Sequence, residues 1–190
     1  MNTEEAKTIR EAQKGSVEAF RMIVESYQKR ACWVAYGLIG NYELARDIAQ
    51  EAFLRVFRAL HKFDTNRNFY TWLYQIIVNL CIDHMRKQGG VKHYSFEDLG
   101  PVSASGVGRE DGSLSPTSRL EKKELSERVH EILAKLPPAY KAVLTLRDIQ
   151  GLELEEIAEI VGSNNATVRW RLFQARKLFR DMWERRGAEV

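Results

Sequence analysis

The sequence predicts an all-α fold, with two small helical domains joined by a flexible linker and a helix-turn-helix in the second domain. Apolar residues recur at the three- and four-residue spacing of amphipathic helices along most of the chain, while strand signals are scarce. Residues 89–117 interrupt this pattern and are rich in glycine and serine, as tethers are. Because helical periodicity returns at residue 119, we expect domains at 1–90 and 119–190 and a linker at 91–118.

The elements of the first domain follow from apolar stripes and caps. Residues 3–27 predict one or two helices with a break at Lys14-Gly15-Ser16, where Ser16 can cap the second. The helix at 43–60 is expected to bury a stripe that includes Ile48, Phe53 and Phe57. A loop is expected at 61–68. The remaining helices of this domain are predicted, in chain order, at 29–39 and from 69 to about 87.

The helix from Phe69 has a polar face that needs an explanation of its own. Leu73, Ile76, Ile77 and Leu80 form its core face. The other face combines aromatic, amide and charged groups, which is how proteins hold single-stranded nucleic acid. The alternative is that Trp72 and Phe69 are core residues, as most aromatics at helical spacing are. The polar face consists of residues that step by three or four: Trp72, Gln75, Asn79, Asp83 and Arg86.

The second domain begins with helices predicted at 119–136 and 139–149, separated by Pro137-Pro138. The segment Gly151–Lys177 then has the pattern of a helix-turn-helix. Its first helix is acidic and stops at Gly162, and Ser163 or Asn164 can cap the second. The second helix is basic, so it is the one expected in a major groove. The alternative is a solvated helical hairpin with one basic face. The basic residues are Arg169, Arg171, Arg176, Lys177 and Arg180.

Composition narrows the class of protein. The 190 residues are 44% hydrophobic and 29% charged, which is typical of a soluble globular chain. No run approaches the ~20 apolar residues of a membrane span, and the amino terminus is not a signal peptide. We therefore expect a cytoplasmic protein with no membrane contact of its own. Cys32 and Cys81 are expected to be reduced core residues. Cys81 and His84 have a zinc-like spacing but lack a second pair, so no metal or other cofactor is expected.

These motifs, in this order, resemble the extracytoplasmic-function sigma factors of the sigma-70 family, the specificity subunits of bacterial RNA polymerase. The resemblance covers nearly the whole chain except the linker. The residues that carry it are Asp47–Leu54 (DIAQEAFL), Phe69–Leu73 (FYTWL), Asn79, Asp83, Arg86, Leu136–Pro138, Val143–Arg147, Gly151–Leu152, Glu156–Ala158, Thr167–Leu172 and Ala175–Arg176.

The resemblance implies an alternative sigma factor and not an enzyme. It implies binding to core RNA polymerase through the β′ clamp helices and the β flap, and promoter-specific initiation through −35 duplex recognition and −10 melting. It also allows an anti-sigma factor as a partner. The matching polymerase-binding residues are Asp47, Gln50, Glu51 and Leu54. The matching −10 residues are Phe63, Arg67, Asn68, Trp72, Asn79, Asp83 and Arg86. The matching −35 residues are Asn165, Thr167, Arg169, Trp170, Arg171, Phe173, Gln174, Arg176 and Lys177.

The sequence departs from the family pattern in the helix-turn-helix. Glu153 stands where a serine or threonine usually caps the first helix, so we expect a weaker helix start. Asn164-Asn165-Ala166 replaces a turn that more often carries a glycine. Trp170 is bulkier than the usual residue, and its indole can contact a thymine methyl or turn onto the protein. The −35 sequence preference therefore remains open.

Two other classes of function are weaker. A stand-alone helix-turn-helix regulator would explain only residues 119 onward. An enzyme is disfavoured because no phosphate loop, metal set or nucleophile–base arrangement is recognisable and the four histidines are scattered. A tether of 89–117 could extend to roughly 95 Å at ~3.3 Å per residue, which exceeds two turns of DNA at ~34 Å each. We expect independent domains and proteolysis near Arg109, although the sequence leaves open whether the domains pack together.

Overall fold

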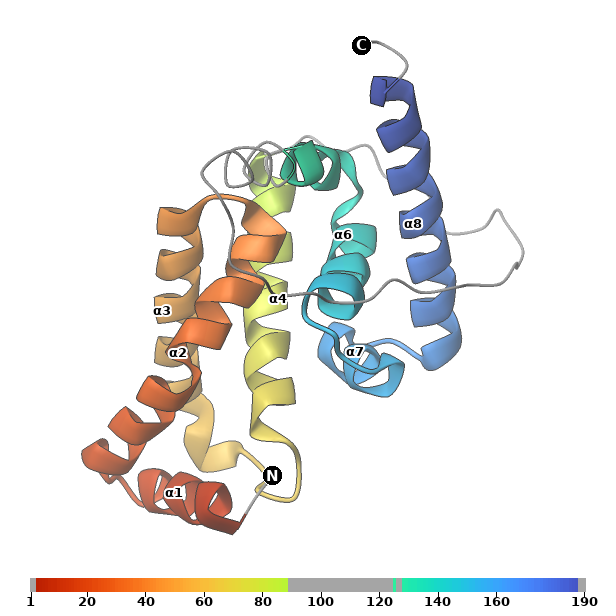
Figure 1. Cartoon of the computed structure of the whole chain (residues 1–190). Helices are drawn as coiled ribbons and strands as arrows, with labels where there is room; N and C mark the ends of the chain where they lie inside the picture. The colour runs from red at the N-terminus through yellow and green to blue at the C-terminus, as the bar shows by residue number, and fades with distance from the viewer. Residues whose placement is uncertain (1–2, 89–124, 126–127, 188–190) are drawn as a thin grey trace, which may run out of the picture.

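The structure, a computed structural model, describes residues 3–88, 125 and 128–187, and within these ranges every regular element is helical (Figure 1). This confirms the predicted all-α class. The linker predicted at 91–118 and the cleavage site near Arg109 lie outside the described residues. The first part of the chain forms α1 (Thr3–Gln13), α2 (Val17–Ile39), α3 (Tyr42–Ala59), the 3₁₀ turn η1 (Leu60–Lys62) and α4 (Phe69–Gln88). The second forms a helical segment at 128–135, α6 (Pro138–Leu144), the π-helical turn η2 (Thr145–Ile149), α7 (Leu154–Val161) and α8 (Asn165–Gly187).

The α2 helix is longer than expected. Its start was predicted correctly, because the Ser16 hydroxyl accepts a hydrogen bond from the Ala19 amide at 3.2 Å. The expected interruption near residue 28 is wrong, and the helix runs unbroken to Gly40, whose φ of 78° ends it in the left-handed region. Glutamine, lysine and arginine at 28–30 are exposed and are good helix formers, so nothing there stops the helix.

Three helices form the centre of the first domain, and α1 closes one end of it. The α2, α3 and α4 helices pack against one another around fully buried residues such as Val34, Ala52 and Ile77. The α1 helix is fastened to the loop that follows α3, because the Gln13 amide donates to the carbonyl oxygens of Leu60 and Phe63 at 2.9 and 2.7 Å. The amino-terminal helix therefore helps to set the path of the chain just before α4.

The second domain contains a π-helical turn where a regular helix was expected. The helix predicted at 139–149 is α-helical only to Leu144, and Thr145–Ile149 forms η2. The Gln150 amide donates to the Thr145 carbonyl at 3.0 Å, five residues back. Such turns are rare inside helices and often mark a site of function or close packing. Here the turn presents Thr145 and Leu146, both fully buried, toward the first domain.

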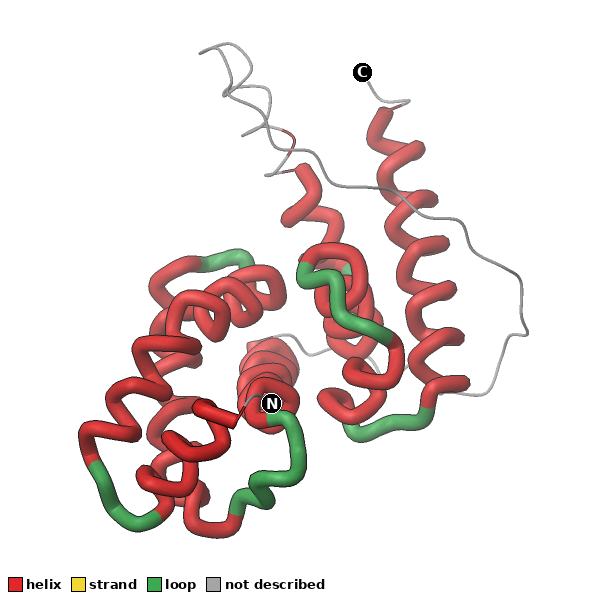
Figure 2. Tube along the Cα trace, turned by 60° about the horizontal axis from the view of Figure 1, so that its bottom comes forward, coloured by secondary structure: helices red, strands yellow, loops and turns green. Residues whose placement is uncertain are grey.

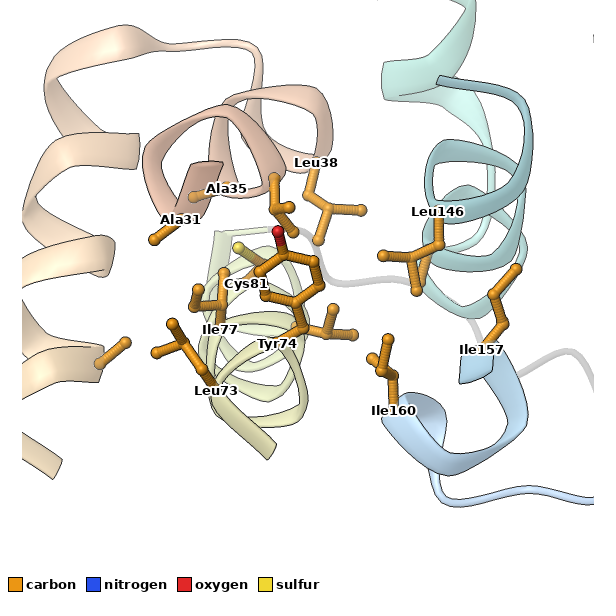
Figure 3. Close-up of a cluster of buried hydrophobic side chains, with 14 of the residues drawn as sticks. Ala31, Ala35, Leu38, Leu73, Tyr74, Ile77, Cys81, Leu146, Ile157 and Ile160 are labelled. Atoms are coloured by element: carbon orange, nitrogen blue, oxygen red, sulfur yellow. The ribbon is translucent and has the colours of Figure 1, made fainter. Parts of the chain in front are cut away.

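The two domains are not independent. Their buried apolar residues belong to one continuous core, and α4 packs on both α7 and α6. Figure 3 shows Leu38 of the first domain pointing toward Leu146 of the second, and Ile160 of the second domain on the side that faces α4. The expectation of independent domains is therefore wrong for this structure. Ile160 of the helix-turn-helix is fully buried and lies in the seam between the domains.

Candidate polymerase and nucleic-acid interfaces

The outward face of α3 carries the residues expected to bind a partner protein. Asp47, Gln50 and Leu54 are exposed, and Leu54 is 52% exposed despite being apolar. Glu51 lies on the same face, and its Oε1 accepts a hydrogen bond from the Arg55 Nε at 2.9 Å. Spacings of three and four residues bring all four side chains onto one surface. The structure therefore gathers the predicted polymerase-binding residues into one exposed face.

Phe57 extends this face and was missed. The sequence places it on the buried stripe of α3, but its side chain is 57% exposed. Its ring meets Phe20 of α2 edge to face, with the centroids 5.0 Å apart. A phenylalanine three residues after Leu54 continues the same side of the helix. The sequence offered one indication of this exposure, because Phe57 follows Leu54 by three residues. It also follows Phe53 by four residues, and that spacing indicated burial.

The aromatic residues at the start of α4 form a packed cluster. Phe63 and Phe69 are 7% and 1% exposed. The rings of Phe63 and Trp72 stack with centroids 4.8 Å apart, and Phe69 meets both edge to face. The core interpretation therefore holds for Phe69, whereas Trp72 stays half-buried. Phe63, expected among the −10 residues, is buried as well. Part of the Trp72 side chain is therefore accessible, whereas the Phe63 ring is covered by its neighbours.

The polar row of α4 is accessible. Asn79, Asp83 and Arg86 are exposed and share one face, as predicted. Arg67 and Asn68 are also exposed, in the loop that leads into α4. The row thus offers one amide, one carboxylate and one guanidinium along about two helical turns.

The loop before α4 has a defined shape. The Asp64 carboxylate accepts hydrogen bonds from the Asn66 amide nitrogens, backbone and side chain, both at 2.9 Å. The Asp64 carbonyl also accepts from the Arg67 amide at 3.0 Å. An aspartate that binds the backbone two residues on makes an Asx turn. The sequence analysis missed Asp64 as the residue that shapes this loop, although Asp-x-Asn is a recognisable turn signal.

The helix-turn-helix forms as predicted. The α7 helix ends at Gly162 with a φ of 62°, and the Asn164 Oδ1 accepts from the Thr167 amide at 2.8 Å at the start of α8. Asn164, rather than Ser163, is therefore the cap. The weak start expected for α7 is offset by Glu156, whose Oε2 accepts from the Glu153 amide at 2.9 Å. This is the reciprocal half of a capping box.

The basic residues of α8 differ in how exposed their side chains are. Arg169 and Lys177 are exposed. Arg176 is half-buried and forms a two-point ion pair with Asp148, with N–O distances of 3.0 and 2.5 Å. That pairing raises the pKa of the Arg176 guanidinium. Gln174, by contrast, is 8% exposed on the core side of the helix.

Two further residues of α8 face the protein. The Trp170 ring meets Tyr140 of α6 edge to face, with the centroids 5.9 Å apart, so the indole turns onto the protein. Arg171 is half-buried with its Nε fully covered, and burial lowers the pKa of its guanidinium. Asn165, Thr167 and Phe173 are also half-buried. Arg169 is therefore the more exposed of the two arginines in the first turns of α8.

The cysteines play a structural role. Cys81 is fully buried, and burial raises the pKa of its thiol to about 12. Cys32 is half-buried, and burial also raises the pKa of its thiol. Neither forms a disulfide. Within the described ranges, no three His, Cys, Asp or Glu side chains come together in a way that could hold a metal ion. A search of the same ranges finds no helix with the length and apolar character needed to span a bilayer.

Both domains match known protein families. Residues 23–91 match the family model for sigma-70 region 2, and residues 126–179 match the model for sigma-70 region 4. The ECF RNA polymerase sigma factor SigW of Bacillus subtilis is 36% identical over 182 residues, which cover 92% of this chain and 94% of that relative. The ECF RNA polymerase sigma-E factor of Escherichia coli K12 is 33% identical over 173 residues, with 89% and 88% covered.

Solved structures share the fold. The structure of CnrH in complex with the cytosolic domain of CnrY gives a TM-score of 0.67 at 21% identity, covering 95% of this chain and 97% of that chain. The sigma factor RpoE of Bartonella quintana, in complex with the anti-sigma factor NepR, gives 0.62 at 20% identity, with 88% and 98% covered. At these identities the likeness concerns the arrangement of helices alone.

Proposed function

We propose a role for each exposed face of this chain, which belongs to the extracytoplasmic-function RNA polymerase sigma factors of the sigma-70 family and acts in promoter-specific initiation of transcription. The α3 face would bind core RNA polymerase, the α4 face would act on the −10 element, and α8 would read the −35 element. The observation that carries the proposal is that both family regions are present in order and that each keeps an exposed polar face on the helix concerned.

The α3 face suits a protein partner better than a nucleic acid. Asp47 and Glu51 would repel phosphate, whereas they would attract a basic protein surface. Leu54 and Phe57 add exposed apolar area beside them, as the centre of a protein interface needs. The residues of this face match the family's docking surface for the β′ clamp helices. The β flap is the corresponding partner proposed for the second domain.

The α4 face suits an unstacked strand of DNA. Its exposed amide, Asn79, can donate to and accept from a base edge, and Arg67 and Arg86 can neutralise phosphate. The half-buried Trp72 is the ring available for stacking, while Phe63 and Phe69 hold its position from behind. Extruding a base costs a few kcal/mol, and contacts of this kind would offset that cost in the open complex.

The exposed side of α8 suits the major groove of duplex DNA. Arginine bound to guanine is the commonest specific contact in that groove, and Arg169 is exposed near the start of the helix. Arg176 would contact phosphate, since Asp148 binds its Nε and Nη2 and leaves the other guanidinium nitrogen to donate. Arg171, partly covered beside Tyr140, would contribute mainly to packing.

We predict different outcomes for three alanine variants of α8. Arg169→Ala should weaken −35 binding by ~1–3 kcal/mol and relax the preference at one base position. Arg176→Ala should weaken all sequences about equally and reduce the salt slope by about one unit. Arg171→Ala should lower the melting temperature of the protein and leave its base preference nearly unchanged. Base-selection assays with the holoenzyme and thermal unfolding would measure these effects. A changed base preference in the Arg171 variant, with none in the Arg169 variant, would mean that α8 is rotated about its axis relative to this proposal.

In vitro transcription tests the proposal as a whole. Purified chain is added to core RNA polymerase on a library of bacterial genomic fragments, and the RNA 5′ ends are sequenced. We expect transcripts that start at a defined distance from a shared pair of sequence elements and that disappear without the chain. A polymerase that gains no new start sites would contradict the proposed function. The same experiment would define the promoter sequence.

A further inference from the structure

We propose that α1 and η1 form a second DNA contact beside the −10 face, in which three cations bind the phosphates of the single strand where it leaves α4 at the loop end. These cations, the basic rim, are Arg10, Lys14 and Lys62, and all three are exposed. The inference rests on the −10 role proposed above for α4 and for the loop before it. It is carried by the hydrogen bonds that fix α1 beside the loop, by the side of α1 that is basic, and by the state of the surrounding carboxylates.

Gln13 fixes α1 beside the loop that leads to α4. Its Nε2 donates to the carbonyl oxygens of Leu60 and Phe63 at 2.9 and 2.7 Å. The ring of the same Phe63 stacks on Trp72 with the centroids 4.8 Å apart, and Trp72 is the ring proposed above for base stacking. In Figure 1, α1 and the loop both lie at the bottom of the molecule, the end that Figure 2 brings forward. A single phenylalanine therefore connects α1 to the −10 face.

The edge of α1 that carries Gln13 is basic. Successive residues of an α-helix are rotated by about 100°, so Arg10 and Lys14 lie about 60° and 100° from Gln13 around the helix axis. The carboxylates of Glu4 and Glu11 lie about 180° and 160° from it. The two cations are therefore on the loop side of α1, and these two carboxylates are on the far side.

Lys62 supplies a cation from the loop side of the contact. It is the last residue of η1 and directly precedes Phe63. Arg67, the phosphate contact proposed above, lies near the other end of the same loop. Lys62 thus extends the cations of the −10 face from the loop toward α1.

The rim cations form no ion pair with any residue that the structure describes. Arginines on the neighbouring helices do form ion pairs, since Arg21 and Arg55 each bind a glutamate. Asp64, the carboxylate of the loop, accepts hydrogen bonds from Asn66. Exposed cations that gather on one surface attract a polyanion. The rim can therefore bind an anion from outside the protein without breaking an ion pair within it.

A single strand of DNA fits the rim because of where that strand runs. A strand stacked on Trp72 continues in two directions, one along the polar row of α4 and the other across the loop toward α1. Contacts to phosphate fix the position of a strand without reading its bases. The rim therefore binds the strand whatever its sequence and steadies the open region at one end.

Removing the charge of the rim tests this contact. A triple variant with Arg10→Gln, Lys14→Gln and Lys62→Gln keeps good helix formers while it loses three charges. The holoenzyme is assembled on a promoter found by the transcription experiment above, and the stability of the open complex is measured over a range of KCl concentrations. Each phosphate contact to a single strand contributes about 0.7 to the salt slope, so the triple variant should have a slope smaller by about 2. Core polymerase is the same in every complex, so the difference measures the rim.

Two further proteins control for net charge and for folding. Lys29, Lys135 and Arg185 are exposed on other helices, and their replacement by glutamine should leave the salt slope of the wild type unchanged. Lys14→Arg with Lys62→Arg should also keep that slope, because a phosphate contact depends on the charge. An unchanged slope in the rim variant would overturn the proposal, and so would an equal decrease in the control triple variant. Failure of the proposed function would look different, since the wild-type holoenzyme would then open no promoter.

Site-specific crosslinking identifies what the rim binds. The photoreactive residue p-benzoylphenylalanine is placed at position 14 of the chain in the holoenzyme, and crosslinked DNA is mapped by primer extension. We expect crosslinks to the strand beside the −10 element, at positions that permanganate shows to be unpaired. The same residue at position 29 of α2 should give none there. Crosslinks from position 14 to a polymerase subunit alone would assign the rim to an acidic protein surface, and crosslinks to duplex DNA alone would assign it to closed DNA. Either result would overturn the proposal.

Discussion

Replacing both Asp47 and Glu51 by arginine is expected to weaken binding to core RNA polymerase by more than about 100-fold, a loss of at least ~2.7 kcal/mol. Both side chains lie on the outward face of α3, and Leu54 and Phe57 beside them add exposed apolar area. Reversed charge would repel a basic partner surface, whereas the buried side of α3 would be untouched. Fluorescence anisotropy of labelled protein with core polymerase would measure the change.

The control carries the same change in charge elsewhere. Glu18 and Glu25 of α2 are exposed, and both pair with Arg21 on the surface. Their replacement by arginine should leave polymerase affinity within about twofold of the wild type, since exposed ion pairs contribute little. Equal losses in the two double variants would show that net charge, and not the α3 face, decides the affinity.

Phe63→Ala and Asn79→Ala are both expected to impair promoter opening, but for different reasons. Phe63 is 7% exposed and stacks on Trp72, so its truncation should cost ~3–5 kcal/mol of stability. For a chain of this size that lowers the melting temperature by roughly 6–20 °C. Asn79 is exposed, so its truncation should change stability by less than about 0.5 kcal/mol yet reduce promoter melting. Thermal unfolding by circular dichroism and permanganate reactivity of promoter thymines would separate the two effects.

Gln28→Ala is the matched control for Asn79→Ala, because Gln28 is an exposed amide on another helix, α2, and does not belong to the polar row of α4. It should melt promoters normally. If Asn79→Ala also melts them normally, the polar row of α4 has no part in opening DNA. If it instead loses stability to the same degree as Phe63→Ala, its defect would be one of folding.

The sequence predicted most helices because each one buries a single stripe. Ser16, Gly40 and Gly162 end or begin helices where local backbone chemistry requires it, and that chemistry can be read from a few neighbouring residues. Phe57 is a residue whose exposure such local patterns do not predict. Its spacing from Phe53 indicates burial, but its side chain is 57% exposed and meets Phe20 of α2 edge to face, which only the tertiary arrangement reveals.

The candidate site was predicted unevenly for the same reason. The exposure of the α3 face and of the polar row of α4 was predicted, because a helical period decides which side chains share a face. The seam between the domains was not predicted, since Arg67 and Glu159 are 92 residues apart and no local pattern pairs them. In α8, Arg169 and Arg171 are two residues apart and lie on nearly opposite sides of the helix, so its rotation about the axis decides that Arg169 is exposed and Arg171 half-buried. The spacing of residues along the sequence predicts that rotation poorly, because both sides of the helix carry an arginine.

One side of α8 packs against the protein and the other side is exposed. This division affects how such a protein could be redirected to other promoters. Val168, Leu172 and Ala175 are buried and hold the helix in place, whereas Ala166, Arg169 and Lys177 are exposed. Substitutions at the outer positions leave the packed side unchanged and so cost little stability. A library randomised at these outer positions could therefore yield variants that drive different promoters from one scaffold. Such variants would be the raw material for orthogonal gene circuits within a single cell.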